Sequence, residues 1–276
     1  MKRSFALLIL CVVASLAPRV MSARPQAAAT PAPAAKPAAP VHHTATAAHT
    51  GTDPALLHPA TLKAKAPDVY EVKFVTTKGD IVIQVTRAWA PNGADRFYNL
   101  VKHGFFTNVS FYRFVKDFIV QFGLNPDPKI TAAWSAANIK DDPVKQSNKL
   151  GTLTFAMGGP DTRQTQLFIN LADNSGSLDG SGFSPIGQVT SGMDIVQQLY
   201  SGYGEISDLG GSGPSQTRIG QGGKAYLDKN FPKLDSIKTA TITSPAPAAA
   251  AAPAAPAHKP AAAAKKPAAA SPAPQQ

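Results

Sequence analysis

The sequence has a single cysteine, Cys11, and few acidic residues, with 17 Asp and Glu against 27 Lys and Arg. One cysteine cannot form a disulfide within the chain, and Cys11 lies in an apolar run that we expect the mature protein to lack. Disulfide scaffolds, thiol catalysis and cysteine metal sites are therefore excluded. The apolar run, 5–16, is also shorter than the roughly 20 residues that a membrane-spanning helix needs. We expect no transmembrane span in the mature form.

The first 23 residues have the pattern of a secretory signal peptide. Lys2 and Arg3 give a positive start, the apolar run follows, and the small residues Ser22 and Ala23 offer a cleavage site. We therefore expect residues 1–23 to be removed and the protein to be exported, to the periplasm of a Gram-negative cell.

Two further segments, 24–65 and 244–276, contain few large apolar residues. The first consists mainly of alanine, proline, threonine and histidine, and the second of alanine, proline and lysine. Such segments bury too little apolar surface to fold, so both are predicted to be disordered spacers. The part between them, 66–243, has the size of one ordinary domain.

The formal net charge of +10 is concentrated in the flanking segments. Residues 66–243 contain 17 basic and 16 acidic side chains, so the predicted domain is nearly neutral. A nucleic-acid partner is not expected, because such a partner requires a basic surface on the folded part. The basic ends are expected to give at most a weak association with the cell envelope.

The spacing of apolar residues within 66–243 predicts a mainly β domain. Strands are predicted at 70–75 and 81–85, joined by a turn as a hairpin, and at 109–114, 118–122, 153–157, 167–171, 183–189 and 236–243. Apolar residues at helical spacing predict helices at 91–103 and 192–199. The glycine-rich stretches 210–213 and 220–223 lack the context of a phosphate loop and are predicted to be loops or turns. Many short strands are typical of an antiparallel barrel or sandwich.

Three stretches, taken in order, resemble one protein family. They are FYRFVKDFIVQ at 111–121, GTLTFAM at 151–157 with TQLFI at 165–169, and LD at 178–179 with Phe183 and IGQV at 186–189. Together with the hairpin and first helix, they resemble the cyclophilin-type peptidyl-prolyl cis-trans isomerases over nearly all of 66–243. The resemblance implies a closed eight-stranded antiparallel β-barrel capped by two α-helices.

The reaction that the resemblance implies is rotation about an X-Pro peptide bond, against a barrier of roughly 18–20 kcal/mol. No bond breaks, so the reaction needs neither a nucleophile nor a metal or other cofactor. A guanidinium stays charged and presents a fixed fork of donors, so it can donate to the lone pair that the prolyl nitrogen gains as the amide twists. The resemblance places Arg113 at the catalytic position and Gln121 beside it. Taken alone, Arg113 could equally be a surface or ion-paired arginine.

The resemblance also implies the residues that bind substrate. Phe118, Ile119, Phe168, Leu178 and Phe183 would form the proline pocket, Gln166 a polar wall, and the main chain of Ala156 and Met157 a pairing edge for an extended substrate. Without the resemblance, these apolar residues would be assigned to the core, because pockets and cores use the same residue types.

The expected partners are proline-containing segments of exported polypeptides, and the protein is expected to act as a monomer that assists their folding. The alternative is a non-catalytic chaperone or peptide-binding module of the cell envelope with the same fold.

Overall fold

The computed structural model describes residues 53–243. The predicted signal peptide, the 244–276 segment and most of the 24–65 segment lie outside the described residues, so what was expected of them stays a prediction. Among residues 53–243, no helix combines the length and the apolar character needed to cross a lipid bilayer.

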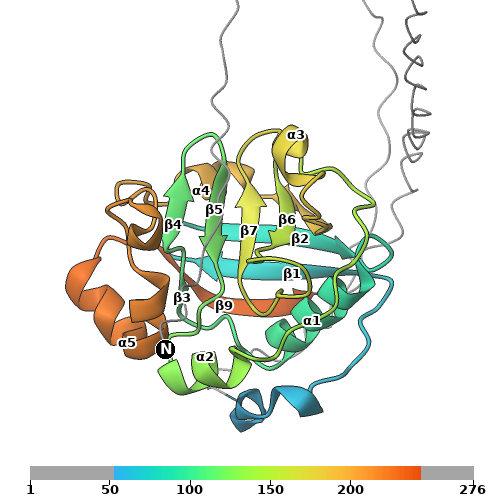
Figure 1. The fold of residues 1–276 in the computed structure, drawn as a ribbon, viewed down its shortest axis with the longest axis horizontal. Coiled ribbons are helices and arrows are strands. Elements are labelled where there is room, and N and C mark those ends of the chain that lie inside the picture. The colour runs from blue at the N-terminus through green and yellow to red at the C-terminus, as the bar shows by residue number, and fades with distance from the viewer. Residues whose placement is uncertain (1–52, 244–276) are drawn as a thin grey trace, which may run out of the picture. The chain divides into compact units, whose positions relative to one another are not determined.

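Nine strands form one curled antiparallel sheet in the order β3-β9-β1-β2-β8-β6-β7-β5-β4 (Figure 1). They are β1 (Val69–Thr76), β2 (Asp80–Thr86), β3 (Val109–Ser110), β4 (Arg113–Val115), β5 (Ile119–Phe122), β6 (Thr152–Phe155), β7 (Leu167–Asn170), β8 (Pro185–Ser191) and β9 (Ser236–Thr243). The expected mainly β antiparallel architecture is confirmed. The closed eight-stranded barrel is not, because the predicted strand at 109–114 is divided: β3 bonds to β9, β4 bonds to β5, and these two strands end the sheet.

The hairpin of β1 and β2 shows how the sequence builds the core. Alternate residues of both strands are buried, and Phe74 lies opposite Ile81 across the pair. Because side chains alternate between the two faces of a strand, the apolar set of each strand faces inward. Phe74 then contacts the rings of Phe97, Phe106 and Phe122, at centroid distances of 5.8–6.2 Å.

The predicted helix at 91–103 is confirmed as α1 (Pro91–Lys102), which buries Ala94, Phe97 and Leu100 in this core. Its N-terminus is capped from a distance in sequence. The carboxylate of Asp142 accepts hydrogen bonds from the backbone N–H groups of Asn92 and Gly93, at 3.0 and 2.9 Å. A negative group there satisfies otherwise unpaired N–H groups of the first turn.

Residues 53–65, assigned from sequence to the first spacer, are packed on the domain. They include two short 3-10 helices, η1 (Pro54–Leu57) and η2 (Pro59–Thr61). The side chain of Leu56 is fully buried, its carbonyl oxygen accepts a hydrogen bond from Trp134 Nε1 at 2.8 Å, and the backbone of Ala64 is bonded in both directions to the Asn99 amide. One buried leucine and a set of backbone hydrogen bonds therefore extend the folded part to Asp53.

The described chain has more helices than periodicity predicted. Besides α1 and the expected α4 (Met193–Gln197), it contains α2 (Pro128–Trp134), α3 (Ser175–Leu178) and α5 (Gln216–Asn230), with η3 at Ser207–Leu209. The prediction of a turn at 220–223 is wrong, because these glycines lie within α5, which is kinked at Gly223. Burial of Ile219 and Leu227 against Tyr112 and Ile206 offsets the poor helix propensity of glycine.

Candidate active site

Three of the candidate residues form a row across neighbouring strands. In the register of the sheet, Arg113 on β4 lies opposite Gln121 on β5, and Gln121 lies opposite Phe168 on β7. Residues directly opposite each other in an antiparallel pair project from the same face. The sheet therefore places a cation, an amide and an aromatic ring side by side, although up to 55 positions separate them in sequence.

The polar end of this row, which consists of Arg113, Gln121 and Gln166, is joined by hydrogen bonds. Arg113 Nη1 donates to Gln121 Oε1 at 2.9 Å, and Gln121 Nε2 donates to Gln166 Oε1 at 3.0 Å. The hydroxyl of Tyr112 donates to the same Gln166 oxygen at 2.5 Å. Each amide is therefore fixed in one orientation, with the Gln166 oxygen accepting two hydrogen bonds.

Tyr112 is almost completely buried beneath the polar end. Burial raises the pKa of its hydroxyl well above the usual range, because the phenolate would lose its hydration. The hydroxyl therefore keeps its proton at any physiological pH and remains a donor to Gln166.

Arg113 also forms an ion pair with Glu205, which lies between α4 and α5. Its Nη2 donates to Glu205 Oε2 at 2.7 Å, and its Nε lies 2.6 Å from Glu205 Oε1, a close contact with poor hydrogen-bond alignment. The Arg113 side chain is 15% exposed. Of the five guanidinium N–H groups, three face Gln121 or Glu205, and one on each terminal nitrogen remains.

The apolar end of the site is a small cluster separate from the main core. Its buried members are Ile119, Phe168 and Leu178, and the partly buried side chains of Phe118, Ala156 and Phe183 pack on them. The rings of Phe168 and Phe183 meet edge to face, with centroids 5.8 Å apart. Met157 is partly buried, and its terminal methyl lies close to Gly182 on the same loop as Phe183.

Buried amides hold the loops that supply the apolar end. Asn148 Nδ2 donates to the carbonyl oxygen of Phe183 and to the Asp179 carboxylate, both at 2.8 Å. Asn174 Nδ2 donates to the carbonyl oxygen of Phe118, also at 2.8 Å. Because these amides are buried, their hydrogen bonds to the carbonyl oxygens of Phe183 and Phe118 fix the backbone at both positions without competition from water.

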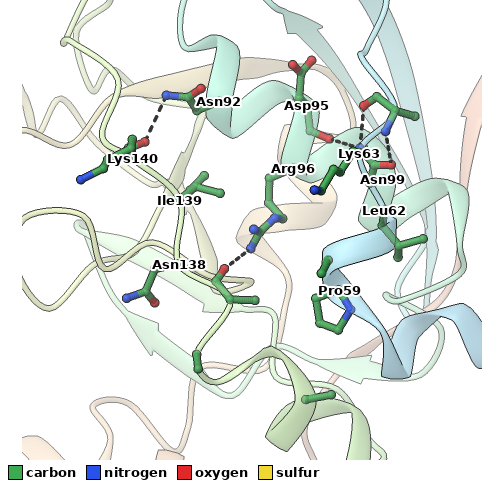
Figure 2. A pocket seen from close by; sticks show the side chains of 15 residues that line it. Pro59, Leu62, Lys63, Asn92, Asp95, Arg96, Asn99, Asn138, Ile139 and Lys140 are labelled. Carbon is green, nitrogen blue, oxygen red and sulfur yellow. Dashed lines mark hydrogen bonds between the residues drawn. The ribbon is translucent and has the colours of Figure 1, made fainter.

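A separate cavity of about 630 Å³ lies between residues 59–64, α1 and the segment 133–140. Figure 2 shows the guanidinium of Arg96 pointing to the backbone of this segment, and Arg96 Nη1 donates to the carbonyl oxygens of Ala137 and Gln164. Burial lowers the pKa of Arg96 to about 10. None of the candidate site residues lines this cavity, and its most buried cation already holds a loop in place.

The structure thus brings the candidate residues together as two adjoining groups. Arg113, Gln121 and Gln166 form the polar end, and the apolar candidates with Ala156 and Met157 form the other. Sequence reasoning did not identify Tyr112 and Glu205 as site residues. The sequence could have indicated Tyr112, because it adjoins Arg113 in the 111–121 stretch, whereas no local pattern marks Glu205.

Several known proteins are similar to this chain. Residues 71–217 match the family model described as cyclophilin type peptidyl-prolyl cis-trans isomerase/CLD. The chain is 34% identical over 136 residues to a peptidyl-prolyl cis-trans isomerase of Acinetobacter baylyi, covering 46% of this chain and 70% of the relative. It is 33% identical over 142 residues to peptidyl-prolyl cis-trans isomerase B of Escherichia coli, covering 46% and 82%. A crystal structure of a Cryptosporidium parvum cyclophilin-type isomerase is similar at 20% identity and a TM-score of 0.48, covering 64% and 98%.

Proposed function

The chain belongs to the cyclophilin-type peptidyl-prolyl cis-trans isomerase family and is an enzyme of that class; we propose that it acts on exported polypeptides and that Arg113 stabilises the twisted amide. The observation that supports this proposal is the row of Arg113, Gln121 and Phe168 across three strands. A donor for the prolyl nitrogen and a binding surface for the prolyl ring therefore adjoin each other.

Rotation about the X-Pro bond interrupts the conjugation of the amide, and the prolyl nitrogen gains a lone pair. Arg113 keeps two N–H groups that face neither Gln121 nor Glu205, and either can donate to that lone pair. The interaction is stronger in the twisted state than in the planar ground state, which is the condition for catalysis. Because Gln121 and Glu205 already orient the guanidinium, little reorganisation is needed during the reaction.

The apolar end would bind the prolyl ring. Ile119, Phe168 and Leu178 are apolar and largely buried, and Phe118 and Phe183 are partly exposed beside them. A ring seated against the exposed parts of these side chains, chiefly those of Phe118 and Phe183, removes apolar surface from water, which contributes about 25 cal/mol per Å². Exclusion of water also strengthens the electrostatic action of Arg113 on the neighbouring nitrogen.

The segment after β6 would pair with the extended substrate backbone. The N–H of Ala156 already donates to the carbonyl oxygen of Gln166 at 2.9 Å. The pairing would therefore use the carbonyl oxygen of Ala156 and the backbone of Met157, and it would not depend on the side chain at either position.

The cellular setting of this proposal follows from the sequence pattern. The positive start and short apolar run at 1–23 favour export to the periplasm, where newly exported chains with slow X-Pro bonds would be the substrates. The basic ends would add at most a weak envelope association, and the enzyme would act as a monomer.

The proposal is tested with Arg113→Ala, using Arg218→Ala on the exposed face of α5 as the matched control. Exchange spectroscopy on an Ala-Pro peptide measures the interconversion rate of the bound peptide, and titration measures its affinity. We expect Arg113→Ala to lower the rate by about 100-fold with little change in affinity, and Arg218→Ala to behave as wild type. Peptide binding without accelerated exchange in the wild type would favour the chaperone alternative. A rate unchanged in Arg113→Ala would show that the guanidinium is not the catalytic group.

A further inference from the structure

We infer that Glu205 is a positioning residue for catalysis, and that the loop 201–214 is built to hold its carboxylate against Arg113. This inference rests on the proposed role of Arg113. It adds a residue that lies 92 positions away in sequence and outside the three stretches that carry the family resemblance.

The geometry of the ion pair supports a role in orientation. Gln121 holds the guanidinium through Nη1 alone, and a planar group held at one corner can still pivot. Glu205 contacts the opposite edge, through Nε and Nη2 at 2.6 and 2.7 Å. Two contacts on different edges fix the plane of the guanidinium, so that its two remaining N–H groups point in a defined direction.

The carboxylate of Glu205 is itself held in place. Its Oε1 accepts a hydrogen bond from the backbone N–H of Ile206 at 2.8 Å. The preceding residue, Gly204, accepts a backbone hydrogen bond from Phe114 at 3.3 Å, which ties the loop to β4 beside Arg113. Ile206 is 2% exposed and packs with Tyr112, so the loop is anchored next to the polar end on both sides of Glu205.

The glycine-rich stretch 210–213 has a clear role in this arrangement. The N–H of Gly213 donates to the carbonyl oxygen of Glu205 at 2.8 Å. A Cβ atom at Gly211 would lie 2.0 Å from the same oxygen, and one at Gly213 would lie 2.7 Å from it. Only residues without a side chain allow the loop to fold so closely on the backbone of Glu205.

A contribution to stability alone would not explain this construction. The Glu205 side chain is 31% exposed, and ion pairs with substantial solvent access contribute only about 0–1 kcal/mol to stability. A role in stabilising the fold and a role in orienting Arg113 therefore predict different effects on the reaction rate. An ion pair that only stabilises the fold can be removed without effect on catalysis by the folded protein.

The test compares Glu205→Ala and Glu205→Asp in the full-length mature protein, with Asp228→Asn as the matched control. Asp228 pairs with Lys224 on α5, so the control removes a carboxylate from an exposed ion pair that does not include Arg113. We expect Glu205→Ala to lower the exchange rate of bound Ala-Pro peptide about tenfold, because a small misorientation is costly in rate, while peptide affinity changes less than about twofold. Glu205→Asp keeps the charge and should recover part of the rate. The ¹⁵Nε signal of Arg113 should shift in Glu205→Ala and stay unchanged in Asp228→Asn.

A second variant separates positioning from charge. Gly211→Ala leaves Arg113 and Glu205 intact but displaces the backbone of Glu205, and it should reduce the rate in the same direction as Glu205→Ala. A wild-type rate in Glu205→Ala, or a faster one, would overturn the inference, and so would a loss of affinity that accounts for the whole effect. If Arg113→Ala abolishes catalysis while Glu205→Ala does not, only this inference fails. If Arg113→Ala also has no effect, the proposed function fails with it.

Discussion

The polar and apolar ends of the candidate site adjoin each other but are held in different ways. The polar end depends on a few directed contacts, one of them from Glu205 in a loop far along the chain. The apolar end depends on packing among Ile119, Phe168 and Leu178 and on buried amides that fix its loops. Directed contacts set orientation and packing sets shape, so we expect changes at the first end to affect the rate and changes at the second to affect binding.

The largest effect on binding and stability is expected at Phe168, the centre of the apolar end. Truncation in Phe168→Ala leaves a cavity and should reduce the free energy of unfolding by about 3 kcal/mol. It should also weaken the binding of an Ala-Pro peptide about tenfold, the equivalent of about 1.4 kcal/mol, and leave the exchange rate of bound peptide within about threefold of wild type. Denaturant unfolding, titration and exchange spectroscopy measure the three quantities.

The matched control is Phe106→Ala in the main core, where Phe106 contacts the rings of Phe74, Phe97, Phe105 and Phe122. It should cause a similar loss of stability without any loss of peptide affinity at a temperature where the protein is folded. Equal losses of affinity in the two variants would show that the apolar end is ordinary core and would remove the distinction between the two ends.

A smaller effect is expected from Asn148, which holds the apolar end without being part of it. In Asn148→Ala, the carbonyl oxygen of Phe183 and the hydroxyl of Thr154 lose their partner, which should cost about 1–3 kcal/mol of stability. The loop that carries Phe183 should loosen, so that the peptide affinity falls about threefold while the exchange rate of the bound peptide stays at the wild-type value. Asn230→Ala on the exposed end of α5 is the control and should change neither quantity. A drop in rate without a drop in affinity would contradict the assignment of Asn148 to the apolar end.

The two ends also differ in how far the sequence could predict them. The alternation of apolar and polar residues predicted the strands of the hairpin, and apolar residues at helical spacing predicted α1. In both cases the inward-facing residues repeat at a regular period. The resemblance supplied both Gln121 and Phe168, and the sheet register then placed them opposite each other. Glu205 could not be found in this way. Its position depends on turns at Gly204 and Gly211 and on burial of Ile206, and these features do not repeat at a regular spacing in the sequence.

The same reasoning explains the errors at the boundaries of the domain. Residues 53–65 have the composition of a spacer, and their folding depends on contacts of Leu56 and Ala64 with residues more than 30 positions away. In α5, three glycines and a kink conceal the helix, whose apolar face is defined only by Ile219 and Leu227. Composition and periodicity detect neither case, because the stabilising contacts are tertiary.

The smallest effect is expected at Tyr112, which is buried and donates a hydrogen bond to Gln166 of the polar end. Tyr112→Phe removes one hydrogen bond to the Gln166 oxygen, which still accepts one from Gln121. Because Tyr112 orients Gln166, we expect the exchange rate of the bound peptide to fall about threefold while the peptide affinity stays unchanged. A loss of affinity instead would assign Tyr112 to the apolar end.

The pH dependence of stability gives an independent measurement of the same residue. Burial raises the pKa of the folded Tyr112 hydroxyl, whereas in the unfolded chain it ionises at about 10. Its contribution to stability is therefore complete below that pH, and it declines as the pH rises further, because the unfolded form releases its proton first. Tyr112→Phe should reduce the alkaline loss of stability but not abolish it, because burial also raises the pKa of Tyr70. If stability falls at alkaline pH in Tyr112→Phe as much as in wild type, the Tyr112 hydroxyl has access to water. The fixed orientation of Gln166 would then need another cause.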